Sequence, residues 1–282
     1  MPLGVRVQLG HAAVQSVVDA AGARALHVKG YALHESLRWE GRVGSDVDLL
    51  VAPTDVAAVL SGLQRAGWRQ QTDFETGSAF EHAATWVHDD FGYVDLHRFY
   101  PGLGDDHARA FEMVWAERDE TQLGGVACPV PSVDAQALMM LLHAGRSRPT
   151  FRTRRDIAHV WESADAAQRE AVRRLVGRLG ADVGFAAAVG DLDAFRGRPD
   201  YELWRVSARG GTRIEEWLAR VRAATSLRAR LRLLLRAPLV NTEHLAAVLN
   251  RPPTRAEVVR EFFDRARRVL AEEWAARRRG AR

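Results

Sequence analysis

The chain has 282 residues, enough for one large or two modest domains, and its apolar (47%) and charged (27%) fractions are ordinary for a globular protein. The sequence shows no run of ~18 apolar residues, no signal-peptide pattern near its start, and a single cysteine, Cys128, which excludes an internal disulfide. These features predict a cytoplasmic protein with no membrane partner.

The charge is unevenly distributed along the chain. Residues 1–100 hold 8 Lys and Arg against 12 Asp and Glu, residues 101–211 hold 15 against 16, and residues 212–282 hold 17 against 8. An acidic head and a basic tail fit a metal-binding half joined to a half that meets anions, although solvated helix faces give the same pattern. Lys29 is the only lysine, a compact charge that suits phosphate.

The first 130 residues alternate between helical and strand patterns. In chain order the predicted elements are a helix over residues 10–21, a strand over 25–28, a helix over 31–39, a strand over 46–51, a helix over 54–66, strands over 68–72, 85–88 and 93–99, a helix over 106–115 and a hairpin over 121–130. This alternation predicts an α/β half.

From Ser132 onward helical periodicity dominates. Predicted helices cover residues 135–143, 156–162, 168–179, 213–224 and 227–235, and a last helix starts at the capping box of Thr254 and Glu257. The change of pattern predicts two domains, one over residues 1–130 and a helical one over residues 131–282.

Two aspartates open the strand at residues 46–51. In a strand alternate side chains share a face, so Asp46 and Asp48 project one way while Val47 and Leu49 can face a core. Two carboxylates at ~4 Å repel by roughly 4 kcal/mol at an effective dielectric of ~20. Full solvation, a proton held by one member or a divalent cation between them would make the pair tolerable. We favour the cation.

The strand over residues 93–99 carries a third aspartate. Asp95 and His97 share one face of this strand, and Val94 and Leu96 take the other. A second Asp-x-Asp pair, Asp191 and Asp193, has no apolar strand behind it and is predicted to lie in a solvated loop. The sequence therefore indicates one carboxylate site, on two strands.

A family resemblance rests on these motifs. They are Lys29-Gly30, Arg42-x-x-Ser45-Asp46-x-Asp48-Leu49-Leu50-Val51 and Val94-Asp95-Leu96-His97. The set resembles the nucleotidyltransferase superfamily related to DNA polymerase β, and most closely its bacterial group of uncharacterised nucleotidyltransferases. The similarity continues through residues 130–134, the helix bearing His143 and residues 155–157, and covers roughly residues 10–165.

The resemblance implies an α+β fold, in which a nucleotidyltransferase-fold mixed β-sheet with flanking helices is followed by an all-helical C-terminal half. It implies that Asp46, Asp48 and Asp95 are catalytic and ligate two Mg²⁺ ions, which suits the preference of magnesium for carboxylates. It also implies that nucleotide phosphates bind at Lys29 and Gly30, where glycine lets backbone amides approach closely.

Two further residues are candidates for nucleotide binding. Tyr31 follows Gly30 where many relatives have serine, and Ser45 or Lys29 is expected to replace the missing hydroxyl. Arg42 either contacts phosphate or pairs with a nearby carboxylate.

Several other side chains have weaker predicted roles. His97 can orient Asp95, act as a base toward the acceptor, or serve only the structure, and His143 and Asp156 are expected to fasten the two halves together. Three histidines are predicted to lie at the surface: His82, His88 and His107. Five aromatic residues of the tail are predicted to be core: Trp204, Trp217, Phe262, Phe263 and Trp274.

These features predict a Mg²⁺-dependent nucleotidyltransferase. It would transfer a nucleoside monophosphate from an NTP, with ATP expected, to a hydroxyl-type acceptor that is a small molecule, a peptide or a protein. One alternative is a non-catalytic module of the same fold that binds a nucleotide or a partner. Another is an RNA-end-modifying nucleotidyltransferase that holds RNA through the basic C-terminal half.

Overall fold

The computed structural model describes residues 1–75, 80–224, 226–236, 245, 249, 251 and 253–280. The chain forms two compact units, Met1–Gly190 and Asp191–Arg282. The sequence placed a boundary at residue 130, which lies inside the first unit. Helix α4 (Val133–Gly145) explains the difference, because it is apolar on nearly all sides and is buried within that unit.

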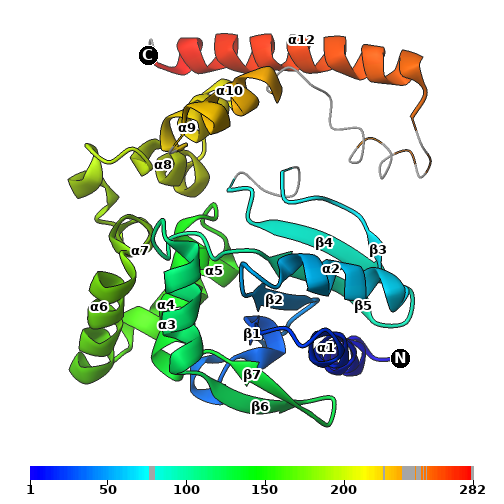
Figure 1. The fold of residues 1–282 in the computed structure, drawn as a ribbon. Helices are drawn as coiled ribbons and strands as arrows, with labels where there is room; N and C mark the ends of the chain where they lie inside the picture. Colours follow the sequence, from blue (N-terminus) through cyan, green and yellow to red (C-terminus); the bar gives the residue numbers. More distant parts are fainter. Residues whose placement is uncertain are drawn as a thin grey trace. The chain divides into compact units, whose positions relative to one another are not determined.

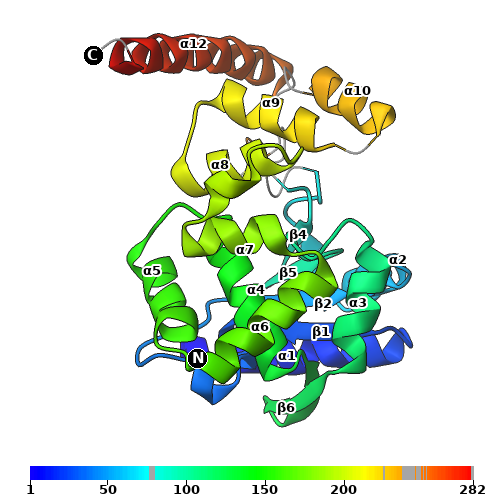
Figure 2. The same ribbon diagram turned by 90° about the vertical axis from the view of Figure 1, so that its left-hand side faces the viewer.

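The first unit holds the mixed part of the fold (Figure 1). Its elements before α4 are α1 (Leu3–Ala20), β1 (Ala25–Val28), the short 3₁₀ turns η1 (Gly30–Ala32) and η2 (Glu35–Leu37), β2 (Val47–Val51), α2 (Val56–Arg65), β3 (Arg69–Gln70), β4 (Ala83–His88), β5 (Gly92–His97), α3 (His107–Ala116), β6 (Asp119–Leu123) and β7 (Val126–Val130). After α4 follow α5 (Phe151–Ile157), a π-helical turn η3 (Ala158–Glu162), α6 (Ala166–Leu179) and α7 (Asp182–Val189). Helix α4 contacts α5, α6 and α7, and Figure 2 shows it among them.

Five strands form one mixed sheet in the order β1-β2-β5-β4-β3. Strands β2 and β5 are parallel, and the other neighbours are antiparallel. Strands β6 and β7 form a separate hairpin. The prediction of a mixed sheet with flanking helices is thus confirmed, although the strand predicted over residues 68–72 is only two residues long.

The two faces of the sheet differ in chemistry. Val47, Leu49 and Val51 of β2 pack with apolar residues of α1 and α2 in one core cluster, as the alternation predicted. The intervening residue Asp48 therefore lies on the opposite face, and so does Asp95 of β5. Carboxylates thus gather on the face away from α1 and α2.

The prediction of a helix over residues 31–39 is wrong. This segment forms only η1 and η2, because contacts with distant parts of the chain hold it in an open path. The amide of His34 donates to Oε1 of Gln136 at 2.7 Å, and Nε1 of Trp39 donates to Oδ1 of Asp156 at 2.8 Å. Tertiary hydrogen bonds here replace those of a helix.

The second unit is helical in its described part. It contains η4 (Leu192–Phe195), α8 (Tyr201–Arg209), α9 (Arg213–Ala223), α10 (Leu227–Arg236) and α12 (Arg255–Gly280), and α9 contacts α8, α10 and α12. The all-helical C-terminal half is confirmed. None of the described helices combines the length and apolar character needed to cross a membrane.

The tail aromatics do not share one environment. Trp204 is buried, as predicted, whereas Phe262, Phe263 and Trp274 are exposed and the prediction of core positions is wrong for them. The capping box of the last helix is present, with the amide of Thr254 donating to Oε2 of Glu257 at 2.7 Å.

Candidate active site

The carboxylate group is assembled by two parallel strands. Asp48 of β2 and Asp95 of β5 are partners in the register, so their side chains lie next to each other on one face of the sheet. Asp46 lies just before β2 and two residues before Asp48. The structure therefore brings together the three aspartates that the sequence singled out.

Asp48 is buried and already has two partners. Its Oδ1 forms an ion pair with Nζ of Lys29 and accepts a hydrogen bond from Nε2 of His97 at 2.9 Å. Burial raises the pKa of Asp48, but Lys29 and His97 outweigh it and leave that pKa below the usual range. Asp48 is therefore ionised, and Lys29 is its counter-ion.

Asp46 and Asp95 carry less well compensated charge. Oδ1 of Asp95 accepts a hydrogen bond from Oγ1 of Thr85 at 2.7 Å, and Oδ1 of Asp46 accepts one from Oγ of Ser45 at 3.0 Å. Burial, followed by the charge of Asp48, raises the pKa of Asp95 to about 6 and also raises that of Asp46. The three carboxylates thus lie close enough to influence one another's ionisation.

Lys29 reaches Asp48 from an unusual backbone conformation. Its φ of 58° and ψ of −170° lie in a region used almost only by glycine, and Gly30 follows with φ 51°. A Cβ on Gly44 would lie 3.0 Å from the Cα of Gly30, so the two backbones approach closely. The predicted nucleotide-binding pair Lys29-Gly30 is a strained turn at the edge of the carboxylate group.

Arg42 pairs with a carboxylate, which was one of its two predicted roles. Its Nε and Nη2 donate to Oδ1 and Oδ2 of Asp156 at 2.7 and 3.1 Å, and both side chains are almost fully buried. Nη1 of Arg42 is buried without a hydrogen-bond partner. Asp156 thereby holds residues 39–42 against α5 by hydrogen bonds, within the first unit. A phosphate contact by Arg42 stays a prediction.

A cluster of Arg146 and two histidines lies beside these carboxylates and was not predicted from the sequence. His82 was predicted at the surface, but it is buried, and the centre of its ring lies 5.0 Å from that of His97 with the two rings tilted. Arg146 hydrogen-bonds to His82 through Nη1 and to Nδ1 of His143 through Nη2 at 3.3 Å. The spacing of His143 and Arg146 on one helix face was the available signal. No local sequence pattern distinguishes His82 from a surface histidine.

Most of the first unit matches a known protein family. Residues 11–190 match the family described as uncharacterised nucleotidyltransferase, which is more than half of the chain. The chain belongs to this nucleotidyltransferase family. The matched residues coincide almost entirely with the first unit, which holds every residue of the carboxylate group. The family's general chemistry is nucleotidyl transfer, so the chain is a transferase of this kind.

Solved structures of three nucleotidyltransferase-related proteins are similar to the chain. They are lincomycin-bound lincosamide antibiotic adenylyltransferase LnuA (19% identity, 55% of this chain and 96% of that one, TM-score 0.39), the antibiotic-resistance factor ANT(2'')-Ia (15%, 68% and 91%, 0.38) and an antigenic nucleotidyltransferase-like protein from Paracoccidioides brasiliensis (13%, 69% and 97%, 0.38). Likeness at this level does not bear on the substrate. No curated protein matches the chain.

The carboxylate group of this nucleotidyltransferase suits Mg²⁺ by its chemistry. Oxygen ligands from aspartates are those that magnesium prefers, and a dication would offset both the burial and the repulsion from Asp48 that raise the pKa of Asp46 and Asp95. As the described side chains lie, no group of three or more His, Cys, Asp or Glu is placed to hold a metal ion. Asp48 is bound to Lys29 instead, and this pair would have to open.

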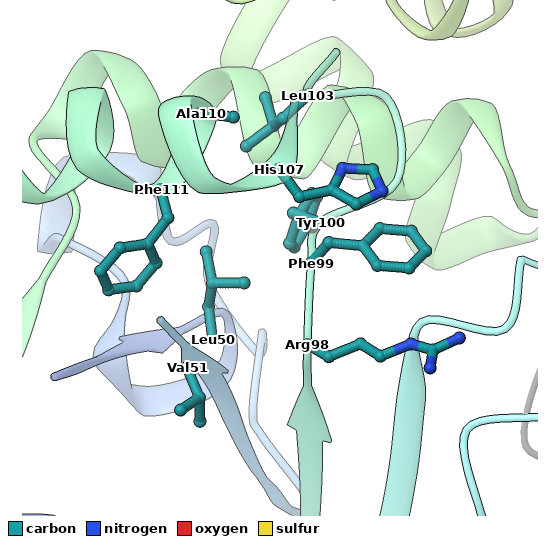
Figure 3. A pocket seen from close by; sticks show the side chains of 9 residues that line it. All are labelled: Leu50, Val51, Arg98, Phe99, Tyr100, Leu103, His107, Ala110 and Phe111. Atoms are coloured by element: carbon teal, nitrogen blue, oxygen red, sulfur yellow. The ribbon is translucent and has the colours of Figure 1, made fainter. Parts of the chain in front are cut away.

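A small pocket lies away from the carboxylates. It measures about 10 Å³ and lies between α3 and the ends of β2 and β5, with His107 stacked on Phe99 at a ring distance of 4.0 Å (Figure 3). His107 is half-buried here, not fully at the surface as predicted. A space of this size holds about one water molecule. The pocket is therefore not the nucleotide site of the transferase.

Proposed function

We propose that the chain is a Mg²⁺-dependent nucleotidyltransferase that moves a nucleoside monophosphate from an NTP, with ATP expected, to a hydroxyl-type acceptor. The observation that carries this proposal is the register pairing of Asp48 with Asp95 on parallel strands, with Asp46 at the start of the first. Family membership supports nucleotidyl transfer in general. The metal, the base and the acceptor are parts of the proposal.

Each aspartate has a neighbour that fixes its position. His97 holds Asp48, Thr85 holds Asp95, and Ser45 holds Asp46 by the hydrogen bonds described above. Asp46, Asp48 and Asp95 would hold the metal, with Asp95 on the acceptor side. Bound Mg²⁺ would supply neutralisation of the phosphate charge and a clamp on the attacking and leaving oxygens.

The Lys29-Gly30 turn would hold the triphosphate. Gly30 has no Cβ, so backbone amides can approach phosphate oxygens. The ammonium of Lys29, which is paired with Asp48, would exchange this partner for a phosphate oxygen of the bound nucleotide. The acceptor hydroxyl gives up its proton to solvent and its oxygen forms a bond to the α-phosphorus, the bond from that phosphorus to the bridging oxygen breaks, and pyrophosphate leaves. Positioning and charge neutralisation are the main contributions of the protein in such a reaction.

Pyrophosphate release tests this proposal. The protein would be given Mg²⁺, each NTP and pools of small-molecule, peptide and protein acceptors. Asp46→Asn should lower the rate roughly a thousandfold, since it removes a metal contact. The matched control is Asp191→Asn, in the second Asp-x-Asp pair, where Asp191 is exposed. It should react like the wild type. An Asp46→Asn variant as fast as the wild type contradicts the assignment.

One observation favours a second candidate, a nucleotide-binding module without transfer. Lys29 already neutralises Asp48, so the site is partly compensated without a metal. This module would bind an NTP equally well with Mg²⁺ or with a chelator and would release no pyrophosphate with any acceptor. Calorimetry and the release assay together separate the two candidates.

A further inference from the structure

Arg146 lies directly after α4 and places a positive charge at the site. Its guanidinium forms no ion pair with a carboxylate of the described residues. Among the described residues its guanidinium hydrogen-bonds only to imidazole nitrogens, Nε2 of His82 and Nδ1 of His143. Its central carbon lies 5.3 Å from the centre of the Tyr100 ring. Removing a cation from water is costly, so a half-buried guanidinium normally has an anionic partner.

The two imidazoles do not supply negative charge. His82 and His143 accept these hydrogen bonds only as neutral rings, because a protonated imidazole has no free lone pair. Burial lowers the pKa of both rings, and the nearby charges of Arg146 and Lys29 lower it further. The guanidinium is thus fixed in place with unused N–H donors. Such a rigid fork, which has no hydrogen bond to a carboxylate, suits a bidentate oxyanion.

The guanidinium lies next to the carboxylates, toward β5. The ring centre of His82 lies 5.0 Å from that of His97 of β5, whose Nε2 is 2.9 Å from Oδ1 of Asp48. Burial lowers the pKa of Arg146, and the charges of Asp48 and Asp95 oppose this. Arg146 is therefore within electrostatic reach of Asp48 and Asp95.

We propose that Arg146 binds an oxyanion on the acceptor, a phosphate or a carboxylate group, while the NTP binds at the Lys29-Gly30 turn. This inference rests on the proposed function, in which Asp95 is the carboxylate next to the acceptor. Its consequence is a substrate class: the acceptor carries both a hydroxyl that is modified and a negative group that Arg146 holds.

Titration calorimetry with inorganic phosphate and with acetate tests this site. Each anion is titrated into the wild type, Arg146→Met, Arg146→Lys and Arg148→Met, with and without saturating Mg²⁺ and a non-hydrolysable ATP analogue. Arg148 is exposed and two residues away, so it is the matched control for loss of charge. Circular dichroism checks that each variant folds. If Arg146→Met does not fold, anion binding by Arg146→Lys is compared with that of the wild type instead.

The expected result is anion binding by the wild type that persists with nucleotide bound. Arg146→Met should weaken it at least about tenfold, Arg146→Lys should weaken it less, and Arg148→Met should leave it unchanged. Tighter binding of phosphate or of acetate identifies the anionic group.

Three results overturn the inference. The wild type binds neither anion, Arg146→Met binds both as well as the wild type, or nucleotide displaces the anion and Arg146→Met weakens nucleotide binding about tenfold. Failure of nucleotide to bind the wild type counts against the proposed function instead, and the nucleotide-free titrations then still test Arg146.

Discussion

The ammonium of Lys29 is ion-paired with the carboxylate of Asp48, and it reaches that carboxylate from a backbone conformation that favours glycine. Val28 of β1 pairs with Asp48 in the sheet, so the strained turn directly adjoins the buried carboxylate. The ion pair therefore does two things. It compensates the charge of Asp48, and it offsets part of the backbone strain at Lys29.

The strain at Lys29 leads to a stability prediction. Lys29→Met and Lys29→Gly both lose the ion pair, but only glycine relaxes the turn. Relief of ~1–3 kcal/mol of strain exceeds the usual cost of glycine in the unfolded chain. We expect Lys29→Gly to be more stable than Lys29→Met by about 1 kcal/mol in denaturant unfolding.

Arg38 is the control for this comparison, because it is exposed and has an ordinary φ of −100°. There glycine should be the less stable of the two replacements. Equal stability of Lys29→Gly and Lys29→Met would show that the turn is not strained.

The substitutions Asp95→Asn and Asp48→Asn should have opposite effects on the stability of the fold. The pKa of Asp95 is raised in the folded state to about 6, from 3.8, so its ionisation opposes folding as the pH rises through this range. At pH 7 Asp95→Asn should be more stable than the wild type, on the order of 2 kcal/mol, and the gain should vanish below about pH 4.

Asp48→Asn should be less stable by roughly 3 kcal/mol at pH 7, because it leaves the buried ammonium of Lys29 unpaired. Urea unfolding at several pH values measures both variants. The same sign for both would contradict the charge distribution described above.

A buried histidine pair predicts loss of stability in acid. Nε2 of His27 donates to Oε1 of Gln15 at 2.9 Å, so Nδ1 of His27 accepts from Nδ1 of His11 at 2.8 Å. Both rings are fully buried, and burial lowers the pKa of His11 to about 4 and that of His27 as well. Their contribution to stability is complete above about pH 6.5 and is lost as the pH falls through 4.

His11→Gln should remove roughly 3 kcal/mol of this pH-dependent change between pH 6.5 and 4. Unfolding free energies at these two pH values check the prediction. Exposed His34→Gln is the control and should keep the wild-type slope. An unchanged slope in His11→Gln would count against a neutral buried pair.

The Arg42–Asp156 pair should be important for stability. Arg42→Met leaves a buried carboxylate unpaired and should cost roughly 3–5 kcal/mol in denaturant unfolding. Arg69 and Asp89 form a similar bidentate pair at the surface, with side chains 60% and 78% exposed. Arg69→Met should therefore cost less than about 1 kcal/mol. Equal costs would contradict the role given to burial.

Local alternation was enough to place the carboxylates. The period of two assigned Val47 and Leu49 to the core and Asp48 to the other face, and the structure agrees. It did not show that Lys29 would neutralise Asp48, because that contact depends on a backbone conformation which lysine seldom adopts.

Other parts of the site depend on contacts between distant residues. His82 and Arg146 are 64 positions apart, and no local pattern relates them. The segment after Gly30 had helical spacing, but bonds from Gln136 and Asp156 hold it open. Helix α4 follows the change of pattern near residue 130 and yet belongs to the first unit, because burial of its apolar surface decides its place.

The most direct test of the central claim is calorimetric titration with Mg²⁺ and a non-hydrolysable NTP, repeated with a chelator, on the wild type, Asp48→Asn and Asp191→Asn. The expected result is binding that requires Mg²⁺, is lost in Asp48→Asn and is retained in Asp191→Asn. Nucleotide binding that is unchanged by the chelator, or equally tight in Asp48→Asn, would contradict a metal-dependent carboxylate site.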